Sequence, residues 1–248
     1  MAGRRRIRLV HKRRLVIFRV LLLVMILSLS LFYFIQSPFW AVGTVAVEGN
    51  RFIPAAELLE LAGIPLGINI FKVDSRAVEQ HLSLHPLVQE VKLVRKLPRE
   101  IQILVRERTP KALIPFEDGF WQIDGEQYVL RRVATVSDSS LPLITGLAAD
   151  DLSPGRRIES ELLGEALRLV DELPPAVREQ VAEIDLSQEN TIFLHTVDGV
   201  KVNFGDSQRV EEKAALMEEI LQTALINKTA LEYVDLSFAG SPVIKYAN

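Results

Sequence analysis

Cysteine is absent from the 248 residues. This excludes a disulfide framework, an iron–sulfur cluster, a Cys-ligated zinc and a thiol nucleophile. Acidic residues are absent from the first 47 positions, where Glu48 is the first acid. A domain without cysteine has no disulfide to stabilise it and depends on the packing of its core.

Charge is therefore distributed unevenly along the chain. Residues 1–19 hold eight of the 29 basic residues: Arg4, Arg5, Arg6, Arg8, Lys12, Arg13, Arg14 and Arg19. The other 21 basic residues share the rest of the chain with all 32 acidic residues, which leaves that part clearly negative. A positive head and a negative body are typical of parts that face different surroundings. The negative body argues against binding to nucleic acid, which needs a basic surface.

An apolar segment joins the two charge regimes. No charge interrupts residues 20–35, and residues 15–18 extend the run past the single charge of Arg19. At about 1.5 Å per helical residue the segment is roughly 31 Å long, which is the thickness of a bilayer's hydrocarbon core. The sequence therefore predicts a transmembrane anchor helix over residues 15–36.

A buried core helix and a cleaved signal peptide are the alternatives. A core helix of this length normally carries a polar stripe, and a signal peptide needs small residues at its cleavage site. The distal end is bulky and aromatic instead, which suits a membrane interface (Phe32, Tyr33, Phe34, Phe39, Trp40). Because the eight early basic residues lie before the apolar run or close to its start, the positive-inside bias predicts a cytoplasmic head at residues 1–14 and export of the remainder.

The next block, residues 42–110, predicts a β-α-α-β-β order. Residues 42–50 alternate as a strand that ends at a Gly-Asn turn. A first helix follows Pro54, with Leu58, Leu59 and Ala62 on its apolar face and Gly63 as its C-cap. A second helix is capped by Asp74 or Ser75 and presents Val78, Leu82 and Leu84. Strands over 88–96 and 100–107 complete a three-stranded sheet covered by two helices.

The last block, residues 111–248, predicts a larger sheet-rich domain with two helices. Asp118-Gly119 and Asp198-Gly199 indicate tight hairpins. Helices are expected over 159–172 and from a cap at Ser207 to about Thr223, and strands over 181–186, 191–197 and 200–204. The segment 183–187 is echoed at 233–237, either by coincidence or because the two are equivalent strands of one sheet. The fold class expected for the whole chain is α+β.

Several ordered segments resemble the FtsQ/DivIB family of bacterial division proteins, which carry an FtsQ-type POTRA domain behind a single span. The segments are 47–50, 67–74, 91–98, 105–112, 121–124, 141–146 and 233–236. They cover nearly the whole chain in the order found in the family. The resemblance implies a POTRA-like domain over 42–110 and a partner-binding domain over 111–248.

Candidates for chemistry are few. His81 and His85 are four residues apart and could share a helix face as zinc ligands or form a solvated pair. Asp185 and Asp235 are candidates for a carboxylate pair or for structural aspartates. Basic residues gather around the predicted hairpin as a solvated face or an anionic site: Lys92, Arg95, Lys96, Arg99, Arg106 and Arg108. Fingerprints of phosphate, dinucleotide or zinc-hydrolase sites are missing, so neither catalysis nor a cofactor or metal is expected.

The C-terminal segment is the main functional clue. Val234, Leu236 and Phe238 alternate with polar residues, and residues 236–244 carry no charge. Exposed edge strands normally protect themselves with charge, so this strand is either an interior strand or an edge reserved for a partner.

The resemblance implies that this strand region receives a strand from a small coiled-coil protein, FtsB or its counterpart DivIC, which pairs with FtsL. The corresponding positions are Phe238, Gly240, Ser241, Val243, Ile244 and Tyr246. Ser237 stands where FtsQ proteins often have arginine, and Pro242 removes one donor from the strand ladder.

The sequence thus indicates a non-enzymatic scaffold of the division machinery, anchored in the plasma (inner) membrane and expected at the division septum. The POTRA-like domain is expected to meet other division proteins. A POTRA-type factor for envelope protein transport or assembly is the alternative, although such factors usually repeat the module. An anchored hydrolase is a third possibility.

Overall fold

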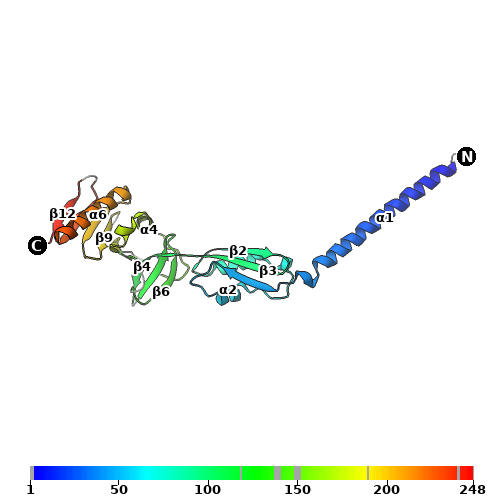
Figure 1. Cartoon of the computed structure of the whole chain (residues 1–248), viewed down its shortest axis with the longest axis horizontal. Coiled ribbons are helices and arrows are strands. Elements are labelled where there is room, and N and C mark those ends of the chain that lie inside the picture. Colours follow the sequence, from blue (N-terminus) through cyan, green and yellow to red (C-terminus); the bar gives the residue numbers. More distant parts are fainter. Residues whose placement is uncertain are drawn as a thin grey trace. The chain divides into compact units, whose positions relative to one another are not determined.

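The computed structural model describes residues 3–117, 119–136, 141–147, 152–188, 190–238 and 241–247, with side chains from residue 16 onward. Its contacts divide the chain into two compact units, Met1–Leu82 with Val91–Val105, and Ser83–Glu90 with Arg106–Asn248. The first elements are α1 (Gly3–Ile35), η1 (Pro38–Trp40), β1 (Thr44–Glu48), α2 (Ala55–Ala62), η2 (Ile70–Lys72), α3 (Ser75–Ser83), β2 (Val88–Lys96) and β3 (Glu100–Glu107) (Figure 1).

The remaining elements alternate strands with three helices. They are β4 (Pro110–Phe116), β5 (Gly119–Asp124), β6 (Val129–Val133), β7 (Leu143–Thr145), α4 (Glu161–Glu172), α5 (Pro175–Arg178), β8 (Val181–Asp185), β9 (Ile192–Thr196), β10 (Lys201–Gly205), α6 (Val210–Asn227), β11 (Leu231–Asp235) and β12 (Val243–Tyr246). The predicted α+β class is confirmed. The last block contains the two expected helices, α4 and α6, and also the short helix α5, which follows α4.

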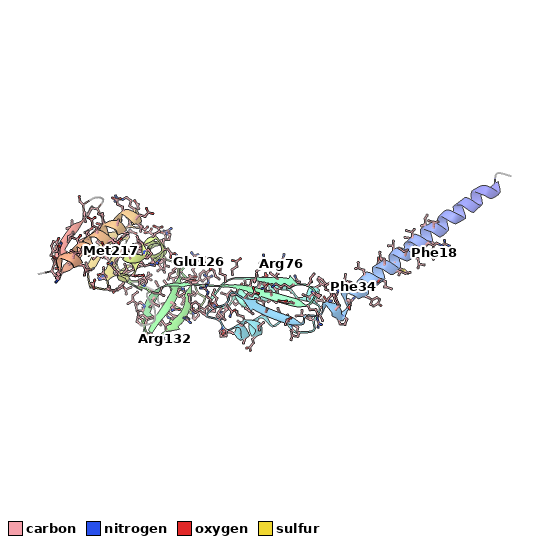
Figure 2. The ribbon with its side chains drawn as sticks, viewed as in Figure 1. Phe18, Phe34, Arg76, Glu126, Arg132 and Met217 are labelled. Atoms are coloured by element: carbon pink, nitrogen blue, oxygen red, sulfur yellow. The ribbon has the colours of Figure 1, made fainter. Side chains whose placement is uncertain are left out.

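Helix α1 begins at Gly3, so the helix includes the basic head as well as the apolar run. Its segment Val16–Ile35 is long and apolar enough to cross a membrane, and none of that segment is buried against another part of the protein. Phe18 and Phe34 stand out from the helix with their rings exposed (Figure 2). The alternative of a buried core helix is therefore wrong.

The three-stranded sheet has the order β1-β3-β2, and β1 runs parallel to β3 with Thr44 opposite Glu100. The bounds predicted for β2 and β3 are confirmed. Helices α2 and α3 bury Leu58, Val78 and Leu82 in the core of this domain. Two predicted core positions are wrong: Leu59 is partly exposed and Leu84, which lies beyond the end of α3, is 79% exposed.

Local capping residues act as the sequence predicts. Asp74 Oδ1 accepts hydrogen bonds from the amides of Arg76 and Ala77, at 3.0 and 3.3 Å, and so caps the N-terminus of α3. Gly63 ends α2 in the left-handed conformation with a φ of 57°.

The second sheet has nine strands in the order β12-β11-β10-β9-β8-β7-β4-β5-β6. Antiparallel hairpins β4-β5 and β9-β10 form at the two predicted turns, although Asp118 itself lies outside the described residues. Helices α4 and α6 contribute Leu163, Leu167 and Met217 to one continuous core with the strands.

The predicted cap of the last helix is wrong. Arg209, in the left-handed conformation, precedes α6 and makes no side-chain capping bond, whereas the Ser207 hydroxyl donates to Glu165 Oε2 at 3.3 Å. The helix also continues to Asn227, beyond the expected end near Thr223. Lys213 lies in the first turn of α6, and its buried ammonium donates to the carbonyl oxygens of Phe204 and Asp206, both at 3.0 Å. These bonds tie the start of the helix to the segment that precedes it.

The repeated sequence 183–187 and 233–237 corresponds to equivalent strands of one sheet. β7 and β8 run parallel and are connected through α4, and β10 and β11 run parallel and are connected through α6. In both units the strand ends in an aspartate whose Oδ1 accepts from the amide of the serine two residues later, at 2.9 Å (Asp185 with Ser187, Asp235 with Ser237). The domain therefore contains two copies of a parallel strand–helix–strand unit.

Candidate partner-binding edge

Strand β12 lies at one end of the nine-stranded sheet, with β11 as its only neighbour in the order of strands (Figure 1). The two strands are antiparallel, and Val234 lies opposite Ile244 and Asp235 opposite Val243. An irregularity between Leu231 and Tyr233 places the extra residue on β11 and leaves β12 regular. Each of the two alternatives for the C-terminal segment holds for one strand: β11, which carries Val234, is interior between β10 and β12, whereas β12, which carries Val243 and Ile244, is an edge.

The open side of β12 can be assigned from one hydrogen bond. The amide of Ala247 donates to the carbonyl of Ala230 at 2.9 Å and so faces β11. Backbone groups alternate direction along a strand, so those of Lys245 and Val243 face β11 as well. The N–H and C=O groups of Ile244 and Tyr246 then point away from the sheet and offer a ladder for another strand.

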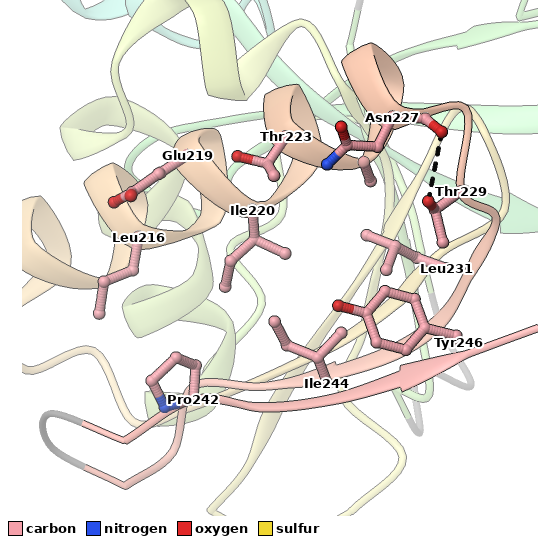
Figure 3. Close-up of a pocket in the computed structure, with 11 residues that line it drawn as sticks. Leu216, Glu219, Ile220, Thr223, Asn227, Thr229, Leu231, Pro242, Ile244 and Tyr246 are labelled. Carbon is pink, nitrogen blue, oxygen red and sulfur yellow. Dashed lines mark hydrogen bonds between the residues drawn. The ribbon is translucent and has the colours of Figure 1, made fainter.

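A groove of about 300 Å³ lies between α6 and β12. Figure 3 shows Ile220 of α6 and Ile244 of β12 pointing toward one another across it, with Leu231 and Tyr246 beside them. Leu216 and Pro242 lie at the other end of the groove. The lining is mostly apolar, so a partner strand added to β12 could insert apolar side chains beneath α6.

The two ends of the sheet differ in what they expose. β6, at the far end, carries the exposed cations Arg131 and Arg132, which discourage strand addition. β12 exposes apolar surface instead, with Val243 59% and Tyr246 54% exposed. Its single cation, Lys245, is paired with Glu232 of β11 at 2.5 Å. The composition of β12 thus favours a partner at this edge.

Asp235 holds the turn that leads from β11 toward β12. Its Oδ1 accepts from the amide and the hydroxyl of Ser237, at 2.9 and 2.5 Å, and its Oδ2 accepts from the Tyr233 hydroxyl at 2.9 Å and from Asn203 Nδ2 at 3.1 Å. Partial burial opposes ionisation of Asp235, but the hydrogen bonds from Ser237, Tyr233 and Asn203 together outweigh it and hold the pKa of this carboxyl below its ordinary value. Burial, together with the hydrogen bond to Asp235, raises the pKa of Tyr233.

The domain that contains the nine-stranded sheet is expected to lose stability in acid through this turn. Because the folded-state pKa of Asp235 is lowered, its contribution is present above its ordinary pKa of about 4 and is lost as the pH falls through the folded-state pKa. Asp235→Asn should lower the free energy of unfolding by about 1–2 kcal/mol at neutral pH, with a smaller difference in acid. Urea unfolding followed by Trp121 fluorescence measures this, with Asp198→Asn at an exposed turn as the control. An equal effect of both substitutions at every pH would contradict the assignment.

The predicted site residues do not all lie on one strand. Val243, Ile244 and Tyr246 lie on β12, but Phe238 and Ser241 lie in the connection from β11, and Gly240 lies outside the described residues. The expectation that Phe238 continues a half-buried strand is wrong, because the strand ends at Asp235 and the Phe238 ring is 70% exposed. Pro242 precedes β12, so its missing N–H does not interrupt the ladder.

The helical wall of the groove was missed from the sequence. Leu216, Ile220 and Thr223 line the groove from α6. A signal was present: the apolar residues Leu225 and Ile226 continue past the predicted end of the helix. Both stay about 80% exposed, at 78% and 79%.

The structure does not bring the candidate metal-binding or acid–base residues together. His85 lies beyond the end of α3, and its Nδ1 accepts from the Leu87 amide at 3.2 Å, so it does not share a helix face with His81. Across the described residues no group of three or more His, Cys, Asp or Glu side chains is placed to hold a metal ion. Asp185 and Asp235 end separate strands, where both carboxylates accept hydrogen bonds from serine amides.

Most of the basic cluster has partners within the protein. Arg95 donates to the carbonyls of Ile70 and Val73, at 3.0 and 2.7 Å, and Arg99 Nε donates to the carbonyl of Ala41 at 3.1 Å. Arg106 pairs with Glu90 at 2.9 Å, while Arg108 pairs with Asp124 and Glu126 at 2.5 and 2.9 Å and lies 3.8 Å from the centre of the Tyr128 ring. Lys92 and Lys96 are exposed. The cluster therefore does not form a single anion-binding site.

Two family models match the chain in the same order as its two sheets. The FtsQ-type POTRA domain matches residues 41–108, and the C-terminal domain of the cell division proteins FtsQ and DivIB matches residues 112–237. The chain belongs to the FtsQ/DivIB family. The predicted identification with these cell division proteins is thereby confirmed, and β12 lies just beyond the second matched range.

Relatives of this FtsQ/DivIB chain come from several bacterial groups. It is 23% identical over 241 residues to cell division protein DivIB of Clostridium botulinum, covering 96% of this chain and 94% of that protein. It is 30% identical over 185 residues to cell division protein FtsQ of Streptomyces collinus, covering 72% of this chain and 69% of that one. The solved extracytoplasmic domain of DivIB from Geobacillus stearothermophilus aligns at 18% identity and a TM-score of 0.34, covering 49% of this chain and 96% of that domain.

Proposed function

We propose that this protein is a non-enzymatic, single-span scaffold of the bacterial division machinery that binds a coiled-coil partner of the FtsL/FtsB (DivIC) type through β12. The observation that supports this best is an open, regular edge strand beside an apolar groove in a member of a cell division family. Strand addition uses main-chain hydrogen bonds for affinity and side-chain pockets for specificity, and this edge offers both.

The proposed binding mode follows from the two sides of β12. The outward N–H and C=O groups of Ile244 and Tyr246 would pair with one strand of the partner. Side chains on the groove side of that strand would contact Ile244, Tyr246 and the α6 residue Ile220 (Figure 3). On the opposite face, the exposed Val243 would be covered by its cross-strand neighbour.

The proposed anchor covers residues 15–36, in which the part of α1 from Val16 to Ile35 is long and apolar enough to cross a membrane. The head would stay in the cytoplasm, because positively charged flanks are retained inside, and the two sheet domains would lie on the outer face of the plasma (inner) membrane. Arg19 is exposed at the start of the span, where its long side chain can reach the headgroups. The backbone of the other seven basic residues is helical, but their side chains lie outside the described residues (Arg4, Arg5, Arg6, Arg8, Lys12, Arg13, Arg14).

The domain boundaries proposed for this scaffold are those expected from the sequence: a head at 1–14, an anchor at 15–36, a POTRA-like domain at 42–110 and a partner-binding domain at 111–248. The POTRA-like domain would contact other division proteins. The match of this domain to the FtsQ-type POTRA model supports its role as a protein-binding module.

The position of the full-length protein in dividing cells tests this proposal. A fluorescent fusion in the native host should form a band at mid-cell that coincides with the coiled-coil partner, because both would belong to one septal assembly. The partner should also co-purify with the fusion. A uniform label around the cell, without co-purification, would instead favour an envelope transport factor or a hydrolase.

A further inference from the structure

Four aromatic rings form a cluster where α1 meets the first domain. Phe34 comes from α1, Phe39 and Trp40 from η1, and Phe71 from η2. The Trp40 ring lies 5.6, 4.9 and 5.3 Å from the centres of Phe34, Phe39 and Phe71, respectively. The cluster therefore joins the end of the apolar helix to the body of the domain.

Asn69 also connects the end of α1 to the first domain, through hydrogen bonds. Its Nδ2 donates to the carbonyl of Ile35, the last residue of α1, at 2.6 Å, and its Oδ1 accepts from the amide of Phe71 at 3.0 Å. The last carbonyls of a helix have no partner within the helix, so this bond satisfies one of them. The loop that carries Asn69 thus lies directly against the end of the apolar span.

The same loop and the turn between β2 and β3 both lie at this end of the domain. The amide of Gly67 donates to Val42, and the amide of Val42 donates to Ile68, both at 2.8 Å. In the turn between β2 and β3, the carbonyl of Arg99 accepts from the Gly43 amide at 2.8 Å. Residues just after η1 therefore hold the loop before η2 and the β2–β3 turn side by side.

The surface at this end is apolar and basic. Its exposed apolar side chains are Phe39 at 53%, Leu66 at 67%, Phe71 at 48% and Leu97 at 56%. The exposed cations Lys72, Lys96 and Arg99 accompany them. We call these seven residues, together with Trp40, the anchor-proximal surface. Aromatic rings combined with lysine and arginine are the composition that favours the boundary between lipid headgroups and acyl chains.

We propose that the anchor-proximal surface is a lipid-binding surface, which seats the first domain in the headgroup layer on the outer face of the membrane and fixes its orientation there. The inference rests on the proposed anchoring by α1. Continuity with the span supports lipid as the occupant, because the bond from Asn69 to Ile35 places this surface at the depth where the span ends. Lys72 and Lys96 complement anionic lipid, since each cation close to such a surface contributes about 1 kcal/mol.

The lack of cysteine makes the test direct, since a single introduced thiol can be labelled without background. Leu97→Cys places an environment-sensitive fluorophore on the anchor-proximal surface. Phe52→Cys is the matched control, because Phe52 is 53% exposed, against 56% for Leu97, but follows the opposite end of β1. That end is about 15 Å away, the length of a five-residue strand.

The labelled full-length chain is reconstituted in vesicles of phosphatidylethanolamine and phosphatidylglycerol. Headgroup spin-labelled lipid should quench the Leu97 probe, and iodide in the water should quench it several-fold less than it quenches the Phe52 probe. The substitutions Lys72→Glu and Lys96→Glu, added to the Leu97→Cys chain, should each reduce the protection of this probe from iodide quenching by about fivefold. Lys92→Glu, on the same strand as Lys96, should leave it unchanged.

The outcomes separate this inference from the proposed anchoring. Equal iodide access at both probes, in vesicles that keep the chain after an alkaline wash, overturns the lipid surface and leaves the anchor intact. Release of the chain by the wash overturns the anchor and the lipid surface with it. Protection of the Leu97 probe in cells but not in vesicles also overturns the proposal, in favour of a protein at this surface.

Discussion

Val243→Asp is expected to weaken binding of the proposed coiled-coil partner by about 30- to 100-fold. Val243 is 59% exposed on the edge strand, so a partner strand would cover it and would have to desolvate an aspartate there. A loss of about 2–2.7 kcal/mol is typical of a central interface residue and corresponds to this change in Kd. The affinity is measured by titrating the full-length chain in detergent with the purified FtsB- or DivIC-type protein.

Val197→Asp is the matched control for this substitution. Val197 is 63% exposed at the turn between β9 and β10, in the same domain but away from β12. The two variants introduce the same charge on equally exposed valines, so effects on solubility or overall stability cancel. If both variants bind like the unchanged chain, the edge is not the docking site.

A second pair of variants separates the backbone ladder from the side chain. Ile244→Pro removes an N–H that faces away from the sheet, which an edge strand tolerates in the free protein. Ile244→Ala keeps this donor but removes the same contacts from the groove. Ile244→Pro should therefore bind at least about tenfold more weakly than Ile244→Ala if strand addition occurs, because one ladder hydrogen bond is lost and its acceptor is left unpaired. Equal affinities would favour side-chain packing without an added strand.

Gly146→Ala is expected to destabilise the second domain more than any other single methyl addition considered. Gly146 follows β7 with a φ of 78°, and a Cβ there would lie 2.2 Å from the amide nitrogen of Ser187. This nitrogen belongs to the turn that Asp185 holds, so the clash is with a fixed backbone. The cost should exceed about 3 kcal/mol, since clash and backbone strain add.

Gly199→Ala provides the comparison, because Gly199 has a φ of 82° but no atom within 4 Å of the added Cβ. Its cost should be only about 1 kcal/mol, from the left-handed backbone alone. Urea unfolding of both variants, followed by Trp121 fluorescence, measures the difference. Similar costs at the two positions would mean that the Ser187 turn moves away to admit the methyl group.

The sequence predicted features that depend on residues close together in the chain. The bounds of β2 and β3 follow from the alternation of their side chains, and the ends of α2 and α3 follow from Gly63 and Asp74. The candidate membrane span follows from the long apolar run, because its length and its low charge can be counted in the sequence. The cap at Ser207 was wrong because a buried ammonium at Lys213 and a left-handed Arg209 begin α6 instead.

The candidate site needed contacts between residues far apart. Whether the C-terminal strand is interior or an edge depends on which strands pair, and the periodicity of one strand does not contain this information. The same limit applies to the basic residues around the β2–β3 turn, whose partners lie as far as 58 residues away, as between Arg99 and Ala41. Because these cations are close together in the sequence, they were predicted as one face or one anion-binding site. In the structure, the arginines are bonded to different parts of the protein.

The sequence by itself determined the family, the candidate membrane span, the α+β class and most element boundaries, because these depend on local pattern and composition. Only the tertiary structure decided that β12 is an open edge, that α6 forms the second wall of its groove, and that Phe238 lies outside the strand. These features arise from strand order and from helix packing across the sheet, which are set by the free energy of burying distant residues together.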